Sequence, residues 1–376
     1  MTRVWRFVLD HRLAVPLGVT IALVWANTRA ESYFALSLAL SFAVNNVGMA
    51  LFFALATQEV IEAMVPGGAL HTWRRAVLPI VAAVGGTIGA IAVYQAYVHF
   101  GDEPLLVAGW PIVCAIDGGF SYFLVRALFG RHRATPFLLL LVIVSDAIGL
   151  TTIGFPQPEV RLHVAAGASA IAAGFGASLA LARLKTRTVW PHLLTGGTML
   201  WWGFRWCGLH PALALIPIVP FLPHAPRGLD LLADEGPHNS ARHLEHALRL
   251  PVQLVLFLFA LVNAGILVRG YGPGTWAVLT GALVGRPLGT LAAVGLARAL
   301  GLRLPTHVGW HELSVVAFIA SIGFTFGLFF VTAVFPVGPT LMELKMGALL
   351  TVVGSPVATA AAWLLGAGRF RSRRAV

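Results

Sequence analysis

The sequence has little charge and almost no cysteine. Asp, Glu, Lys and Arg make up only 11% of the 376 residues, whereas 58% are hydrophobic and the mean hydropathy is +0.82. A soluble domain of this length does not need so much apolar surface, so the composition indicates an all-α polytopic membrane protein. The two cysteines, Cys114 and Cys207, lie in apolar stretches, which excludes a disulfide framework and a cysteine-based metal site.

Acidic residues are scarcer than basic residues, and the formal net charge is +11. In a soluble protein this excess would indicate nucleic-acid binding. In a membrane protein it is explained by basic loops that stay on the cytoplasmic side, so we expect no nucleic-acid partner. The first apolar stretch follows Arg3 and Arg6 and has no small-residue cleavage site, so we interpret it as the first transmembrane helix.

Apolar stretches fill nearly the whole chain, and a helix that spans a bilayer needs about 20 such residues. We predict a single transporter domain over residues 1–376 with about twelve transmembrane helices. Residues 1–224 hold the first eight, residues 225–249 form a cytoplasmic polar loop, and residues 250–376 hold the last four. The predicted spans lie near 12–28, 36–58, 76–98, 106–128, 136–156, 160–183, 189–205, 207–224, 250–268, 275–298, 313–335 and 343–366.

The distribution of basic residues tests this topology. If the N-terminus is cytoplasmic, the outer loops carry only Arg29, Arg161, Arg205, Arg269 and Lys345. Every other Lys or Arg lies on the cytoplasmic side, apart from a single arginine inside the membrane. A missed span would reverse the side of all later loops, so this bias predicts a multi-pass protein with both termini in the cytoplasm.

Three charged residues lie inside otherwise apolar spans. Asp117 lies in PIVCAIDGGFSYF, Asp146 in LLLLVIVSDAIGL and Arg286 in LTGALVGRPLGTLAAV. A charge near the middle of a bilayer costs about 3 kcal/mol or more, so such residues usually mark the path of an ion or substrate. These three residues therefore favour a transporter.

Two of the predicted spans contain glycine pairs near their middle. The fourth carries Asp117 followed by Gly118 and Gly119, and the eleventh carries SIGFTFG with Gly323 and Gly327. Such glycines can permit close helix packing, or they can mark the interrupted helices that form the binding site of a secondary transporter. Because one pair follows an aspartate, we favour the second interpretation.

Several longer segments match one protein family in order along the chain. They are FAVNNVGMALFFALATQEV, AGWPIVCAIDGGFSYF, IVSDAIGL, LHPALALIPIVPFLP, LEHALRLPVQLVLFLFALVNAGI, VGRPLGT, SIGFTFGLFF and KMGALLTVVGSPVATAAAW. Together they resemble the NhaA family of bacterial sodium/proton antiporters. The resemblance implies inverted repeats, in which spans three to five mirror spans ten to twelve and the broken fourth and eleventh helices cross near the bilayer midplane. It also implies the bacterial inner membrane.

The same resemblance assigns roles to the charged residues. Asp146 is the carboxylate expected to bind either Na⁺ or a proton, and Asp117 and Ser145 are expected to belong to the same ion- and proton-binding site. Asp117 is expected to offset the positive N-terminal ends of the broken helices, and Arg286 the negative C-terminal ends. Sodium ions and protons are then the transported substrates, the lipid bilayer is the other partner, and no resident cofactor is expected. The role implied for the exchange is sodium and pH homeostasis.

The sequence departs from the family pattern at several of these positions. Ser145 stands where the family has the first residue of an Asp-Asp pair, and Arg286 stands where it has lysine. Ile116 replaces a threonine before Asp117, and Asn46 replaces an aspartate. The short segment 28–34 has no room for the β-hairpin through which the family dimerises, so any homodimer would have to form without that contact.

Two of these departures bear on the number of protons exchanged. Serine does not titrate near neutral pH, and arginine is effectively never deprotonated in a protein. Asp146 is then the one obvious proton-exchanging site. We therefore expect electroneutral exchange, one proton for one sodium ion. Electroneutral relatives in the wider superfamily also combine a single key aspartate with an arginine, which supports this by analogy.

Four other residues are weaker candidates. Glu59, His210 and Glu245 match family positions linked to the entrance funnel or to pH response, although solvated helix ends and an ordinary polar histidine explain them nearly as well. Thr325 lies in the eleventh-span break and offers a hydroxyl to the ion path, although membrane helices often bond such hydroxyls to their own backbone.

Three alternatives remain open at the level of function. An intramembrane aspartyl protease needs two aspartates that share a proton, but the sequence contexts here differ from that class and Arg286 would have no role. We therefore predict that the protein is not an enzyme. A paralogue that no longer exchanges Na⁺ for H⁺, as a sensor or scaffold, is the second alternative. The third is an exchanger selective for another cation, such as K⁺ or Li⁺.

Overall fold

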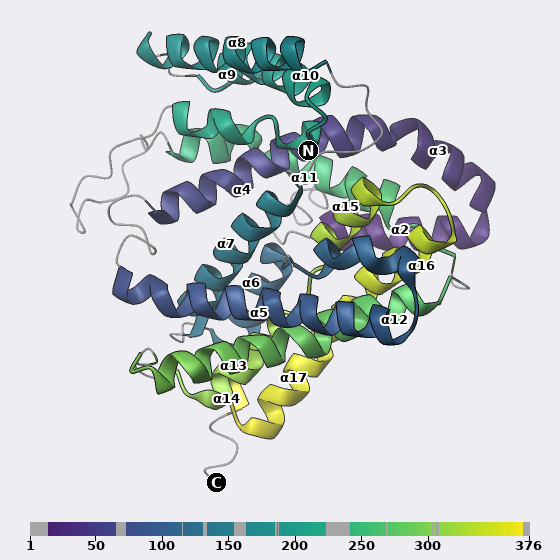
Figure 1. The fold of residues 1–376 in the computed structure, drawn as a ribbon, viewed down its shortest axis with the longest axis vertical. Coiled ribbons are helices and arrows are strands. Elements are labelled where there is room, and N and C mark those ends of the chain that lie inside the picture. Colours follow the sequence, from purple (N-terminus) through teal and green to yellow (C-terminus); the bar gives the residue numbers. More distant parts are fainter. Residues whose placement is uncertain are drawn as a thin grey trace, which may run out of the picture. The chain divides into compact units, whose positions relative to one another are not determined.

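The computed structural model describes most of the chain. The described residues are 14–64, 73–114, 116–130, 134–153, 163–184, 186, 188–222, 241–267, 270–302, 304 and 308–370. Within these ranges the secondary structure consists of helices, with no strand (Figure 1). This confirms the all-α architecture predicted from composition.

The chain forms two compact units, each built from two separate stretches of sequence. Unit 1 comprises residues 1–68 and 150–265, and unit 2 comprises residues 69–149 and 266–376. Unit 2 therefore contains the two stretches that the predicted inverted repeat pairs with each other, spans three to five and spans ten to twelve. The single domain with a division at residues 225–249 stays a prediction. Residues 225–240 of that loop lie outside the described ranges, and residues 241–249 are helical.

Unit 1 begins with two consecutive helices, α2 (Ala14–Thr28) and α3 (Ala30–Phe42). Only Arg29 separates them, so the described chain leaves no space there for a β-hairpin. The second span continues from α3 through a π-helical turn into α4. The elements of this unit are α2 (Ala14–Thr28), α3 (Ala30–Phe42), η1 (Ala43–Gly48), α4 (Met49–Met64), α8 (Val164–Arg183), α9 (Trp190–His192), η3 (Leu193–Gly197), α10 (Thr198–Trp206), η4 (Pro211–Leu213), η5 (Ile216–Phe221) and α11 (Ala241–Asn263).

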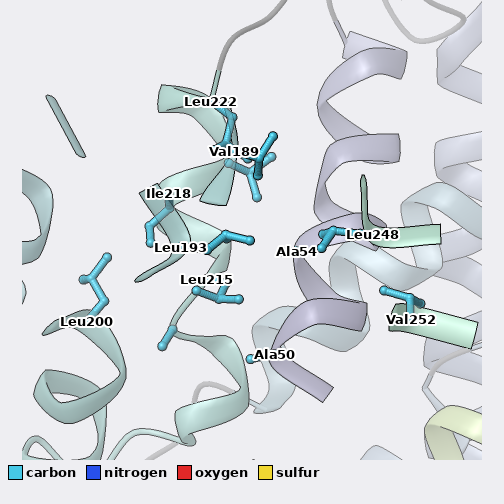
Figure 2. Close-up of a cluster of buried hydrophobic side chains, with 12 residues drawn as sticks. Ala50, Ala54, Val189, Leu193, Leu200, Leu215, Ile218, Leu222, Leu248 and Val252 are labelled. Carbon is cyan, nitrogen blue, oxygen red and sulfur yellow. The ribbon is translucent and has the colours of Figure 1, made fainter. Parts of the chain in front are cut away.

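Aliphatic side chains from four parts of unit 1 form its core. Ala54 of α4 packs in one cluster with Leu193 of η3, Ile218 of η5 and Leu248 of α11 (Figure 2). All four side chains are buried. The cluster joins segments that are far apart in the sequence, so it fixes the path of the short helices η3 and η5 against the long helices.

The eighth predicted span, residues 207–224, differs from a continuous helix. The described part contains two short 3-10 helices, η4 and η5. Pro211, Pro217 and Pro220 explain this interruption, because proline lacks the backbone N–H that an α-helix needs and clashes with the preceding turn.

Tyr33 closes the C-terminal end of α11 inside unit 1. Its hydroxyl lies 2.9 Å from the carbonyl oxygen of Leu261 and accepts a hydrogen bond of 2.9 Å from the N–H of Gly265. The ring of this buried tyrosine lies against the Cα of Gly265, where a Cβ atom would overlap the phenol. Ser37 donates a further bond of 2.7 Å to the carbonyl of Val262. Two carbonyls of the last turn, those of Leu261 and Val262, are thereby satisfied by side chains.

Unit 2 contains the long paired helices and the two broken spans. Its elements are α5 (Trp73–Phe100), η2 (Pro104–Val113), α6 (Gly118–Phe129), α7 (Ala134–Ile153), α12 (Pro273–Thr280), η6 (Gly281–Gly285), α13 (Arg286–Ala299), α14 (Trp310–Ile319), α15 (Phe324–Val334), α16 (Pro339–Leu350), η7 (Thr351–Val353) and α17 (Gly354–Leu365).

Helices α5 and α13 run side by side in unit 2 (Figure 1). Glycines allow this close approach: a Cβ atom on Gly89 would lie 2.5 Å from the carbonyl oxygen of Gly285 and 2.6 Å from the Cα of Gly289. Both neighbours are backbone atoms, which cannot rotate away. Lipid is as apolar as the helix surfaces, so helices in a membrane associate mainly through van der Waals packing. Small residues at the contact allow that close packing.

We expect Gly89→Ala to destabilise the protein by about 1–3 kcal/mol, because the added methyl group must push α5 and α13 apart. Gly176→Ala in α8 is the matched control, since a Cβ there meets no atom within 4 Å. That change should stabilise its helix by up to about 1 kcal/mol. Thermal melting of both purified variants in detergent tests this. A Gly89→Ala protein that melts at or above the wild-type temperature would contradict the packing described.

Five described helices are long and apolar enough to cross a membrane on their own. They are the helices over Ala30–Gln58, Ala76–Phe100, Val164–Arg183, Pro273–Ala299 and Pro339–Phe370. The pair α14 and α15 passes the same test as one span, bent by 42°. These helices confirm a polytopic membrane protein, whereas the total of about twelve spans stays a prediction.

Candidate functional site

Both predicted helix breaks are present, and they meet. The fourth span is helical to Val113 in η2 and resumes at Gly118 in α6. The eleventh span is helical to Ile319 in α14 and resumes at Phe324 in α15. The backbone N–H of Asp117 in the first break donates a hydrogen bond of 2.7 Å to the carbonyl of Ile322 in the second. The unwound interpretation of these glycine-containing segments is therefore confirmed.

The four half-helices pair across the breaks. Helix α6 packs against α14, and η2 packs against α15. The hydroxyl of Ser121 in α6 donates a bond of 3.2 Å to the carbonyl of Ile319 at the end of α14. The second half of the fourth span thus contacts the first half of the eleventh span, and the first half of the fourth contacts the second half of the eleventh. The two broken spans therefore cross.

The glycines that suggested the breaks have different roles. Gly323 precedes α15 as its N-terminal capping residue. Gly327 lies inside α15, where a Cβ atom would be only 3.0 Å from the side chain of Ala348 in α16. The alternative interpretation, close helix packing, therefore applies to Gly327. Gly118 and Gly119 begin the helical part of α6, so the unwound residues precede them.

Asp117 lies at the N-terminal ends of two helices. Its side chain is only 8% exposed and accepts a hydrogen bond of 3.1 Å from the N–H of Phe120 in the first turn of α6. The same carboxylate accepts a hydrogen bond from the Thr325 hydroxyl and another from the Thr325 backbone N–H, in the first turn of α15. A carboxylate is favoured there because both helix ends carry partial positive charge.

Thr325 is the residue that the sequence alone undervalued. Ile116, which is buried, lacks the hydroxyl that the resemblance leads one to expect beside Asp117. The structure supplies a hydroxyl to Asp117 from the other broken span, through Thr325. The signal in the sequence was the position of Thr325 directly after the break in SIGFTFG, but its partner depends on how the two spans cross.

Arg286 lies at the C-terminal end of a half-helix, whereas Asp117 lies at N-terminal ends. Arg286 is the first residue of α13 and only 1% exposed. Its guanidinium donates a hydrogen bond to the carbonyl of Val113, the last residue of η2. The C-terminal end of a helix carries partial negative charge, so the cation is placed where the helix end favours it. The structure thus brings Arg286 and Asp117 to the two sides of one break, as residues of the same unit.

Asp146 and Ser145 lie in α7. The backbone of Asp146 is helical, and its side chain lies outside the described residues. The side chain of Ser145 is fully buried, and its hydroxyl has no hydrogen-bond partner among the residues that the structure describes. The family position held by an acidic residue thus carries a small neutral group in this chain.

The three candidates for pH response lie in unit 1. Glu59 belongs to α4 and Glu245 to α11, but the side chains of both lie outside the described residues. His210 is buried, and its Nδ1 accepts a hydrogen bond of 3.2 Å from the N–H of Ala212 at the start of η4. The histidine therefore caps a short helix, which is a structural role that sequence reasoning did not separate from titration.

Asn46, at the family's aspartate position, lies in the π-helical turn η1. Its side-chain amide donates a hydrogen bond of 3.1 Å to the carbonyl of Phe42. Its backbone carbonyl accepts a hydrogen bond of 3.2 Å from the indole N–H of Trp201. The neighbouring Asn45 pairs with Asn263 of α11, whose amide donates 2.8 Å to the Asn45 side chain. These bonds satisfy polar groups within an apolar span, as a transmembrane helix requires.

Comparison with known proteins agrees with this architecture. The family model for Na⁺/H⁺ antiporter 1 matches residues 14–365. The "Na(+)/H(+) antiporter NhaA" of Geobacter metallireducens is 39% identical over 94% of this chain and 96% of its own, and that of Desulfitobacterium hafniense is 35% identical over 98% of both. The sodium proton antiporter MjNhaP1 from Methanocaldococcus jannaschii shares the fold with a TM-score of 0.58 and 14% identity, over 95% of this chain and 92% of that one. The members are named as ion transporters rather than enzymes, and the chain belongs to the Na⁺/H⁺ antiporter 1 family.

Proposed function

We propose that the protein exchanges Na⁺ (or Li⁺) for H⁺ across the bacterial inner membrane, with both termini in the cytoplasm. The observation that carries this proposal is the crossing itself. Two broken spans meet there, with Asp117 at two helix N-termini and Arg286 at the carbonyl end of η2. Interrupted helices that meet inside a membrane protein form the ion and substrate sites of secondary transporters. The names of the relatives, Na⁺/H⁺ antiporters, support Na⁺ and H⁺ as the substrates.

The chemistry of the exchange follows from one carboxylate. Asp146 in α7 is the proposed group that binds either the metal ion or a proton, because hard carboxylate oxygens suit a small hard cation. It cannot hold both at once, and this competition couples the two fluxes. Asp117 and Arg286 hold the crossing in place by matching the partial charges of the helix ends. The hydroxyls of Ser145 and Thr325 are further oxygen ligands that this proposal assigns to the ion path.

The purified protein in liposomes tests the proposal directly. An outward Na⁺ gradient should drive H⁺ into liposomes that contain the protein, and a pH-sensitive dye inside them should report the change. Empty liposomes are the control. A protein that moves no H⁺ in response to Na⁺ or Li⁺ at any pH would contradict the proposed function. The same assay with K⁺ distinguishes an exchanger of different cation selectivity.

We further propose that the exchange is electroneutral. The second carboxylate of the family pair is replaced by Ser145, which is buried and does not titrate in this range. The family lysine is replaced by Arg286, which is bonded to the carbonyl of Val113 and keeps its proton at any physiological pH. The Asp117 carboxylate is engaged by the donors of two helix ends. Asp146 is then the one group left to exchange a proton, so one H⁺ should exchange for one Na⁺.

An imposed membrane potential should therefore leave the rate of Na⁺-driven H⁺ movement unchanged. The potential can be set with K⁺ gradients and valinomycin in the same liposomes, and each elementary charge moved would gain about 2.3 kcal/mol per 100 mV. The variant Ser145→Asp restores a second acidic group and is expected to make the exchange sensitive to potential. A wild-type rate that follows the potential strongly would overturn electroneutrality.

The departures at Ser145, Ile116 and Asn46 support one alternative, a paralogue that has lost the exchange and acts as a sensor or scaffold. The liposome assay separates the two proposals, because such a paralogue would move no H⁺ in response to a Na⁺ gradient. Regulation by pH through Glu59, His210 or Glu245 also remains a proposal. It predicts that variants at these positions shift the pH range of activity without abolishing transport.

A further inference from the structure

One buried hydroxyl in unit 2 has no assigned role. The side chain of Thr87 in α5 is 5% exposed, and its Oγ1 has no hydrogen-bond partner among the described residues. Threonines in membrane helices usually bond to the carbonyl four residues earlier. Thr332 and Thr280 of the same unit do this, at 3.0 Å to Leu328 and 2.8 Å to Trp276. Thr87 therefore differs from these two threonines.

The position of Thr87 along α5 places it at the depth of the crossing. It lies at the middle of the helix Trp73–Phe100, just as Arg286 lies at the middle of the span Pro273–Ala299 that packs beside it. The preceding residue, Gly86, faces that arginine: a Cβ atom there would lie 3.4 Å from the Cγ of Arg286.

The face of α5 that carries Thr87 points toward η2. Ala90 and Tyr94 lie three and seven residues later, so they share this face of the helix. The Tyr94 hydroxyl donates 2.7 Å to the carbonyl of Leu106 in η2. A Cβ atom on Gly281 would lie 3.1 Å from the carbonyl of Ala90 and 3.1 Å from the side chain of Val113. Ala90 therefore lies at the level of Val113, where η2 ends and the break begins. Thr87 lies about one helical turn further along α5, on the side of the break.

We propose that Thr87 is part of the ion path, where its hydroxyl oxygen contacts the passing cation directly or through one water molecule. A buried hydroxyl without a partner destabilises a protein, so a transported ion or its water gives this group the interaction that its own helix does not. Hydroxyl oxygen is a suitable ligand for a hard cation. The inference rests on the proposed exchange of Na⁺ for H⁺ and extends it to a residue that neither motif nor charge had singled out.

Thr87→Val tests the inference because it keeps the branched shape and removes only the hydroxyl. We expect the Na⁺ concentration for half-maximal exchange to rise about fivefold, the loss of roughly one neutral hydrogen bond. Thr87→Ser keeps the hydroxyl and should restore the wild-type value. Thr332→Val is the matched control, since its hydroxyl already bonds to the carbonyls of Leu328 and Phe329. That variant should leave the Na⁺ dependence unchanged.

The melting temperature of the same variants separates this role from a structural one. If Thr87 is only a packing residue, Thr87→Val should melt at a higher temperature than the wild type and keep the wild-type Na⁺ dependence, and that result overturns the inference. If Thr87→Val does not fold, Thr87→Ala provides the same reading. An active wild type with unaltered variants refutes only the role of Thr87. A wild type that does not respond to Na⁺ refutes the proposed function as well.

Discussion

Replacing Asp146 with asparagine is expected to abolish Na⁺-driven H⁺ movement while the protein still folds. Asparagine is close to aspartate in size but carries no charge and cannot exchange a proton. If Asp146 is the group for which Na⁺ and H⁺ compete, no other group at the site takes its place, because Ser145 is neutral, Arg286 keeps its proton and the Asp117 carboxylate is engaged by the donors of two helix ends. The dye signal of liposomes that contain Asp146→Asn should equal that of empty liposomes.

A second change of aspartate to asparagine controls for the chemistry of the substitution. Asp102 lies exposed in a loop with a φ of 53°, a backbone conformation in which asparagine is as well tolerated as aspartate. Asp102→Asn should transport at the wild-type rate. Residual exchange in Asp146→Asn that saturates with Na⁺ as the wild type does would show that another group carries the proton, and the mechanism would have to be reassigned.

Replacing Asp117 with alanine should produce the largest loss of stability of any single change at the crossing. The substitution leaves the Phe120 N–H, the Thr325 N–H and the Thr325 hydroxyl without their shared acceptor in a buried site. Hydrogen bonds to a charged group contribute about 1.5–3 kcal/mol each, so a total loss of about 3 kcal/mol or more is expected. Thermal melting of the purified variant measures it, together with its exchange rate.

Asp117→Asn separates hydrogen bonding from charge. The amide oxygen can still accept at the helix ends, but the negative charge that offsets them is lost. Its melting temperature should lie between those of Asp117→Ala and the wild type. Equal melting temperatures for Asp117→Ala and the wild type would mean that the carboxylate does not hold the crossing together.

The charged residues of the crossing were predictable because charge is so costly inside a membrane. Asp117 and Arg286 stood out against apolar surroundings, and glycine pairs indicated the two breaks. Their partners were not predictable, because the contact of Arg286 with the carbonyl of Val113 and that of Thr325 with Asp117 arise only when two distant spans cross. Backbone acceptors leave no trace in residue type.

Other features were missed because sequence patterns describe single helices. The prolines of residues 211–220 interrupted a span that hydropathy alone presents as continuous. Thr87 was not singled out, since a threonine in an apolar helix ordinarily bonds to its own backbone. Only the helix packing reveals that its hydroxyl lacks such a bond. The division of the chain into interleaved units likewise depends on contacts between remote stretches.

The fit between Tyr33 and Gly265 limits how this part of the chain can diverge. The phenol fills the space that any larger residue at position 265 would occupy, and its hydroxyl bonds to the same backbone that it covers. A methyl group at 265 is compatible only with a smaller residue at 33, and that residue would leave the end of α11 unsatisfied. The two positions are therefore expected to covary among related sequences. A relative with a larger residue at position 265 should carry a smaller residue at position 33.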